Sequence, residues 1–139
     1  MITLDAARKM VEVARAKGRE MGLKPLSVAV LDAGGHVLVF EREDGASPGR
    51  FEIARGKAYG AVMLGMPGSA QMARAEGQAY FMAAVNGAFG GKVVPVPGGV
   101  LVLKDGVVLG AVGVTGDTSD NDAAAAVAGI EAAGFEASA

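Results

Sequence analysis

The stretch GGVLVLKDGVVLGAVGVTGDTSDND, Gly98–Asp122, decides the fold, because it predicts a β-hairpin that leads directly into a helix. Two apolar runs rich in β-branched residues, Val100–Leu103 and Val107–Val114, flank Asp105-Gly106, a pair suited to a two-residue type I′ turn. That turn predicts three cross-strand pairs, namely Lys104 with Val107, Leu103 with Val108, and Leu101 with Gly110. Because both faces of the second strand are apolar, we expect a central strand covered on both sides.

The residues after this strand predict a helix that starts at a short polar turn. The strand ends at Thr115-Gly116, and a mostly alanine helix is expected from about Ser119 to Ala133. Ser119 is the predicted N-cap of this helix, and Asp122, three residues later, is placed to close a capping box.

Three further helices are predicted from the spacing of apolar residues and from capping residues. The first runs from about Leu4 to Met21. The second starts at Ser47-Pro48, a capping residue followed by Pro at the first helical position. Ser69 is expected to cap the third helix, which ends near Asn86-Gly87.

A second hairpin lies between the first two helices. Its predicted strands are Ser27–Leu31 and Val37–Arg42, and the segment DAGG between them forms the turn. His36 opens the second strand. Because side chains alternate along a strand, His36 is expected on the same face as Leu38 and Phe40.

The order of these elements predicts the fold class. Helices and hairpins are segregated along the chain, which is typical of an α+β protein with an antiparallel sheet. We expect about five strands, built from the two hairpins, with helices on both faces and the inner strands of the hairpins paired. The proline-rich segment Lys92–Gly99 is predicted to be a loop or a short edge strand. Residues 1–139 are expected to form one domain.

Composition narrows the classes of protein to which this chain can belong. Lys and Arg number 13 against 15 Asp and Glu, and the net charge of −2 predicts no basic surface for nucleic acid. No apolar stretch is long enough to span a membrane, and the N-terminus lacks the apolar segment of a signal peptide, so we expect a cytoplasmic protein. Hydrophobic residues make up 51% of the chain, which favours a homo-oligomer that buries part of this surface.

Few side chains are able to carry chemistry. The absence of Cys and the presence of a single His exclude thiolate and multi-histidine metal sites. His36 is either a hydrogen-bonded hairpin residue or a metal ligand or acid–base group. Arg50, Arg55 and Lys57 form either a solvated helix face or a clamp for the carboxylates of a ligand. The acidic residues after Gly116 lack the pattern of a calcium loop and are better explained by helix capping.

Three segments carry a family resemblance. They are VAVLDAGGHVLVFEREDGA at Val28–Ala46, EIARGKAYGA at Glu52–Ala61, and PGGVLVLKDGVVLGAVGVTGDTSDND at Pro97–Asp122. Together and in this order they resemble the GlcG/HbpS family of small haem-binding proteins, which is related to the C-terminal domain of PduO. Two positions depart from the family pattern, because Leu101 stands where Pro usually follows GGV and Glu43 stands where Met commonly precedes DGA.

The resemblance implies a profilin-like fold, assembly into homo-oligomers and binding of haem, with a corrinoid as the less favoured tetrapyrrole. Two classes of function remain open. One is a binding protein without enzymatic activity. The alternative is a small-molecule enzyme or accessory subunit in organic-acid or diol catabolism, acting at a subunit-interface pocket. Its titratable candidates are His36, Lys57, Asp32 and Asp122.

The predicted ligand site lies where Thr115-Gly116, at the end of the central strand, approaches Arg55, Lys57 and Tyr59 of the second helix. Two positive side chains there can hold an anionic group, a carboxylate or a haem propionate. The start of the last helix adds the positive end of its dipole. His36 is the candidate metal ligand, either in this pocket or in that of a neighbouring subunit.

Overall fold

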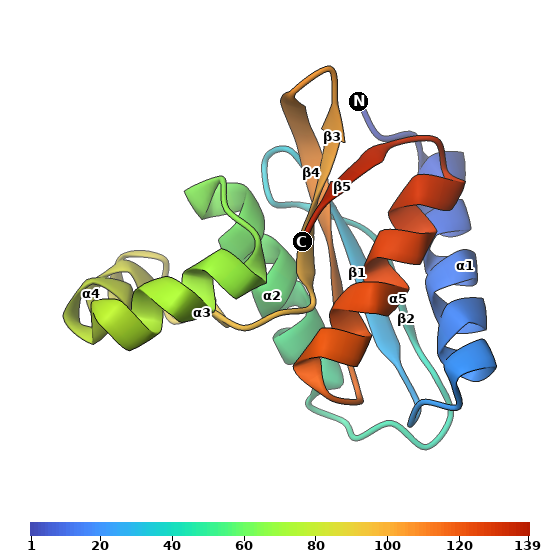
Figure 1. The fold of residues 1–139 in the computed structure, drawn as a ribbon, viewed down its shortest axis with the longest axis horizontal. Coiled ribbons are helices and arrows are strands. Elements are labelled where there is room, and N and C mark those ends of the chain that lie inside the picture. Colours follow the sequence, from blue (N-terminus) through green and yellow to red (C-terminus); the bar gives the residue numbers. More distant parts are fainter.

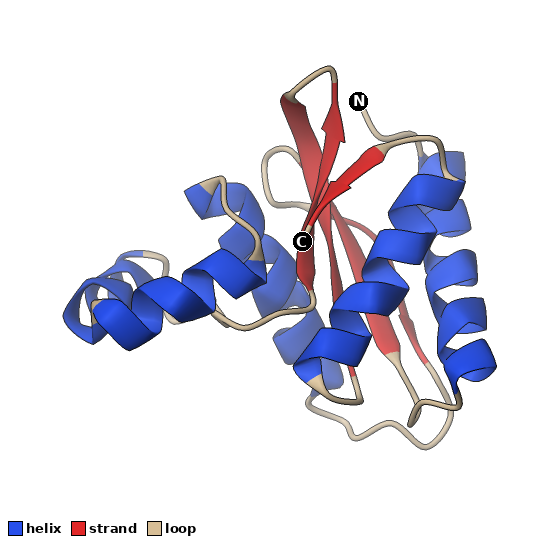
Figure 2. Cartoon of the chain, viewed as in Figure 1, coloured by secondary structure: helices blue, strands red, loops and turns tan.

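The computed structural model describes residues 1–139 and consists of three layers (Figure 1). One sheet is covered on one face by α1 (Leu4–Met21) and α5 (Ser119–Ala132), and on the other by α2 (Arg50–Leu64). The strands are β1 (Ser27–Asp32), β2 (Val37–Arg42), β3 (Gly99–Lys104), β4 (Val107–Thr115) and β5 (Glu136–Ser138). All neighbours are antiparallel, in the order β2-β1-β4-β3-β5. Figure 2 shows the strands, in red, as one layer between helices. The structure therefore confirms the α+β class, the five-stranded antiparallel sheet and the helices on both faces.

The central place of β4 agrees with its sequence. β4 pairs with β1 on one side and with β3 on the other, so the inner strands of the two hairpins meet as predicted. Val112 and Val114 of β4 face α1 and α5, in a core that also contains the valines of β1 and β3. The opposite face packs on α2 through small side chains, among them Ala54, Ala58 and Ala111.

Two glycines let α2 lie directly on the sheet. Gly99 of β3 and Gly113 of β4 are paired across the strands. A side chain on Gly99 would overlap the backbone carbonyl of Lys57, and one on Gly113 would overlap that of Ala54. The close approach that glycine permits therefore fixes the height of α2 above the end of β4.

Bulges in both hairpins overturn two predictions of register. Lys104 pairs with Val107 and Leu103 with Val108 as predicted, but the register then shifts. Leu101 pairs with Ala111, so the predicted partner, Gly110, was wrong. A bulge adds one residue to one strand and moves every later pair.

The second bulge lies in β2 near Leu38. Val37 pairs with Leu31, whereas Val39 pairs with Val30, so Leu38 is the extra residue. Leu38 packs on the α1 side of the sheet and Phe40 on the α2 side. The prediction that His36 shares one face with both was therefore wrong, because strict alternation does not continue through a bulge.

Helix starts were predicted less well than helix positions. α2 begins at Arg50 after Gly49, not at Ser47-Pro48, and no side chain caps it. Thr118, not Ser119, is the N-cap of α5, since its side chain accepts from the Asn121 backbone N–H at 3.3 Å. The side chain of Asp122 therefore has partners other than those of a capping box, as described below.

The third predicted helix is two helices, α3 (Gly68–Gly77) and α4 (Ala79–Ala88). Gln78, with a φ of −141°, separates them, and α3 follows Pro67 without a side-chain cap from Ser69. These two helices form an arm that projects from the three-layer body (Figure 1). The edge strand β5 was not predicted from its residues, because three residues without an apolar run carry too little pattern.

Candidate ligand site at the end of the central strand

A buried ion pair holds the C-terminal end of β4. Lys57 Nζ donates to the carbonyl oxygen of Val114 at 3.0 Å and to Asp122 Oδ2 at 3.2 Å. The two charged side chains are only 4% and 1% exposed. Gly98 makes room for this contact, since a Cβ there would lie 2.9 Å from Lys57 Nζ. Lys57 of α2 therefore ties the end of the central strand to the start of α5.

The same pair orders the backbone that follows β4. Asp122 Oδ1 accepts the backbone N–H of Asp117 at 2.9 Å, so both oxygens of this carboxylate are used. Burial lowers the pKa of Lys57 and raises the pKa of Asp122, and their mutual attraction opposes both shifts. The positive charge of Arg50 adds to the lowering of the Lys57 pKa. Lys57 thus positions Thr115–Asp117 and does not present its ammonium group to a ligand.

A pocket of about 200 Å³ lies where the loops after α1, β2 and β4 meet the start of α2. Its lining consists of Lys24, Pro25, Gly45, Ala46, Ser47, Arg50 and Gly116. The Arg50 guanidinium is held by two hydroxyl groups, because Nε donates to Ser47 Oγ at 3.0 Å and Nη1 donates to Thr115 Oγ1 at 2.8 Å. The pocket therefore adjoins the predicted Thr115-Gly116 position, but its cations are Lys24 and Arg50.

Arg55 lies outside this pocket. Its guanidinium carbon lies 5.3 Å from the centre of the Phe51 ring, a cation–π geometry. Arg55 Nε is buried and has no hydrogen-bond partner. Of the residues predicted for the site, Thr115, Gly116 and the buried Lys57 are thus gathered at the end of β4, and Arg55 is not in contact with them.

His36 and Tyr59 belong to the opposite end of the sheet. His36 is 80% exposed at the β1–β2 turn, with Nδ1 3.2 Å from Asp32 Oδ1. The same oxygen accepts the backbone N–H groups of His36 and Gly34, and these hydrogen bonds lower the pKa of Asp32. Tyr59 lies beside the turn, since a Cβ on Gly35 would be 3.3 Å from its ring.

The register of β1 against β4 gives the distance between these two ends of the sheet. Thr115 pairs with Ser27, and Gly110 pairs with Asp32, five residues further along β1. At about 3.3 Å per residue this corresponds to about 17 Å. One protomer therefore does not bring His36 to Thr115.

The two cations of the pocket were not assigned to the site from the sequence. The sequence analysis named Arg50 in a positive cluster with Arg55 and Lys57. Its position at the start of α2 is the feature that could have assigned it to the pocket. Lys24 gave no such signal, because its position depends on how the loop after α1 crosses the end of the sheet.

None of the helices combines the length and hydropathy that a membrane crossing requires.

Comparison with known proteins gives consistent matches. Residues 2–131 match the family described as haem degrading protein HbpS-like. A Citrobacter freundii protein from the dhaT-dhaS intergenic region is 34% identical over 121 residues, 87% of this chain and 84% of that protein. The crystal structure of a PduOC:heme complex superposes with a TM-score of 0.87 at 23% identity, covering 99% of this chain and 98% of the other. The crystal structure of a double mutant of Streptomyces reticuli HbpS superposes with a TM-score of 0.79 at 32% identity, covering 93% of this chain and 84% of the other.

Proposed function

Because the chain belongs to the HbpS-like family, we propose that it is a small homo-oligomeric protein that binds haem or a related tetrapyrrole. Membership of this family is the observation that carries the proposal. The PduOC domain, which shares the fold, has been crystallised with heme. Haem is therefore preferred over a corrinoid as the ligand.

The end of β4 is the proposed place for an anionic group of the ligand. The pocket there has two cationic side chains, Lys24 and Arg50, and the hydroxyl of Thr115 lies against the guanidinium. A propionate at this position would lie about 17 Å along the strands from the end of the sheet that carries His36 of the same protomer. His36 of a neighbouring copy is therefore the iron ligand that we propose.

The arm supports a homo-oligomer. α4 contains no charged residue, yet only Met82 of its ten residues is buried. Tyr80 is 74% exposed, and Met72 of α3 is also exposed. An apolar helix without a polar face is normally covered, and a second copy of this chain is the occupant we propose.

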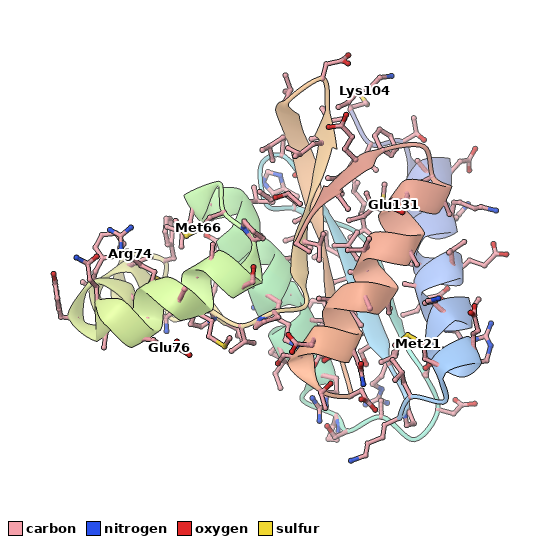
Figure 3. All side chains as sticks on the ribbon, in the orientation of Figure 1. Met21, Met66, Arg74, Glu76, Lys104 and Glu131 are labelled. Carbon is pink, nitrogen blue, oxygen red and sulfur yellow. The ribbon has the colours of Figure 1, made fainter.

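A haem titration tests the proposed ligand. Wild-type protein is expected to give a Soret change that saturates at a fixed stoichiometry. Thr115→Val, which keeps the side-chain shape but removes the hydroxyl, is expected to weaken binding by up to about tenfold. His36→Ala is expected to change the spectrum if imidazole binds the iron, and Lys104→Ala, at the tip of the β3–β4 hairpin (Figure 3), is the control. An unchanged Soret band with intact protein contradicts haem binding and favours the enzyme or accessory-subunit alternative.

Light scattering tests the proposed assembly. Tyr80→Glu places a charge on the exposed apolar side of the arm and is expected to reduce the oligomer mass, whereas Lys104→Glu on the body is expected not to. A monomer mass for the wild-type protein across the micromolar range contradicts the assembly.

A further inference from the structure

We infer that the pocket at the end of β4 is a receptor for a single alkyl carboxylate group, held by the guanidinium of Arg50. This inference deepens the proposed function and rests on it in part, because the carboxylate is either a propionate group of haem or a free small carboxylic acid. Both sources present the same chemistry to the pocket.

The size of the pocket limits its occupant. About 200 Å³ lies between Lys24, Pro25, Gly45 and Gly116. Pockets that enclose drug-sized ligands are typically about 300–1,000 Å³. The space therefore suits a carboxylate with a short alkyl chain and does not enclose a tetrapyrrole ring.

Arg50 is oriented but not neutralised. A guanidinium group has five N–H donors. In this structure one is used by Ser47 Oγ and one by Thr115 Oγ1, and no carboxylate lies within ion-pair distance of Arg50. By contrast, Arg15 is paired with both Glu41 and Glu43. Three donors remain on Nη1 and Nη2, and these two nitrogens together can bind a carboxylate through two hydrogen bonds.

A second polar group at the same corner lacks a partner. Ser27 is fully buried, and its Oγ makes no hydrogen bond. Ser27 is paired with Thr115 across β1 and β4, which places the two side chains on the same face of the sheet. Buried hydroxyl groups are usually hydrogen-bonded. Ser27 does not line the pocket, so its free hydroxyl marks a polar layer behind Thr115 and is not itself a contact for the occupant.

The charges around the pocket are of both signs. Lys24 and Arg50 supply the positive charge. Asp44 adjoins Gly45 in sequence, and the Asp117 carboxylate accepts the backbone N–H of Lys24 at 3.0 Å. These negative charges offset part of the attraction, so a doubly charged anion such as phosphate gains less over a carboxylate than it would from the two cations alone.

The experiment consists of two measurements that distinguish a haem propionate from a free carboxylic acid as the occupant. In the first, sodium propionate is added to the wild-type protein at constant ionic strength, and the amide signals of Gly45 and Gly116 are followed by NMR. In the second, the affinity for haem is compared with that for haem dimethyl ester, whose propionates carry no charge. Both measurements are repeated with Arg50→Met, with Arg50→Lys and with the control Lys104→Met at the tip of the β3–β4 hairpin (Figure 3).

Two results support the inference. If haem is the source, esterification and Arg50→Met each weaken binding by about 10- to 100-fold, and Arg50→Lys recovers only part of the loss. If a free acid is the source, propionate shifts both glycine signals saturably, and Arg50→Met abolishes the shifts without affecting haem. Lys104→Met leaves the binding of both ligands unaffected.

The inference is overturned if propionate gives no saturable shift and haem affinity depends neither on esterification nor on Arg50. The ester comparison needs no variant, so a failure of Arg50→Met to fold does not remove the test. Failure of the proposed function has a different signature, because wild-type protein that binds no haem can still show the propionate shifts.

Discussion

The two ends of the central sheet hold their charged side chains in opposite ways. At the end of β4, Lys57 and Asp122 are buried and paired, and they connect α2, β4 and α5. At the β1–β2 turn, His36 and Asp32 form a pair in which the imidazole is mostly exposed. The first pair belongs to the structure that shapes the pocket, whereas the second is free to contact a ligand at little cost to folding. Residues that were equal candidates in the sequence as titratable groups therefore have different roles in the structure.

The largest effect is expected from Lys57→Met, which breaks the buried pair while retaining the length of the side chain. The Asp122 carboxylate and the Val114 carbonyl then lose their shared donor inside the protein. Removing one partner of a buried ion pair typically costs about 3–5 kcal/mol. Urea denaturation is expected to show a loss of this size in the free energy of unfolding.

The double variant Lys57→Met/Asp122→Asn sharpens this test. The asparagine side chain introduced at position 122 has no charge to leave unpaired, and its oxygen can still accept the backbone N–H of Asp117. We expect the double variant to recover most of the stability lost in the single variant. Equal losses in both variants would show that the buried charge is not the cause.

A backbone change at the turn end is expected to have an intermediate effect. Gly35 has a φ of 81°, a left-handed conformation that a β-branched residue resists, and its missing side chain faces Tyr59 and Met63. Gly35→Val is expected to cost about 1–3 kcal/mol. Gly34→Val is expected to cost less, because a side chain there meets mainly the exposed ring of His36. Thermal melts in which Gly34→Val is the more damaging change would contradict this account.

Much of the fold could be predicted because its signals are local. The apolar faces of β4, the Asp105-Gly106 turn and Gly22 after α1 each specify one conformation through neighbouring residues. The bulges at Leu38 and Leu109 could not be predicted in this way, because a bulge is fixed by how one strand packs on its partners. β5 depends likewise on the edge that β3 offers it.

A pocket beside Gly116 could be anticipated from the sequence, but the side chains that line it could not. Lys57 and Arg55 are separated by two positions on one helix, and a helix directs such neighbours to different sides. Lys57 is buried against Asp122, while Arg55 lies over Phe51. The start of α2, which places Arg50 at the pocket, depends on the loop before it and not on the Ser47-Pro48 pattern.

The loss of stability at acid pH, the acid limb of the curve of stability against pH, is expected to depend on Asp117 at the β4 end. Hydrogen bonds from the Asn121 side chain and from the backbone N–H groups of Lys24 and Thr118 lower the pKa of Asp117 to about 2. Because this pKa is below the unfolded value of about 3.9, the stabilisation is complete above that pH and is lost as the pH falls toward 2.

Asp117→Asn is therefore expected to flatten the fall in stability between about pH 4 and pH 2. Asp122 acts in the opposite direction, because its raised pKa favours the protonated carboxyl in the folded state. Urea midpoints measured across this range are the readout. The exposed Asp120, whose side chain makes no hydrogen bond, supplies the control variant Asp120→Asn. An acid limb that both substitutions change equally would assign the effect to net charge.

The smallest effect on stability is expected from the exposed pair at the turn. An asparagine in place of Asp32 can still accept the backbone N–H groups of Gly34 and His36, so Asp32→Asn removes only the charge. Exposed ion pairs contribute about 0–1 kcal/mol, and we expect urea denaturation to show a change within about 0.5 kcal/mol for Asp32→Asn and for His36→Ala. This small effect makes the turn informative, because a change in the haem spectrum of either variant then reports on the ligand and not on damage to the fold. A loss of about 3 kcal/mol or more in both variants would make the turn as structural as the Lys57–Asp122 pair, and the contrast between the two ends would fail.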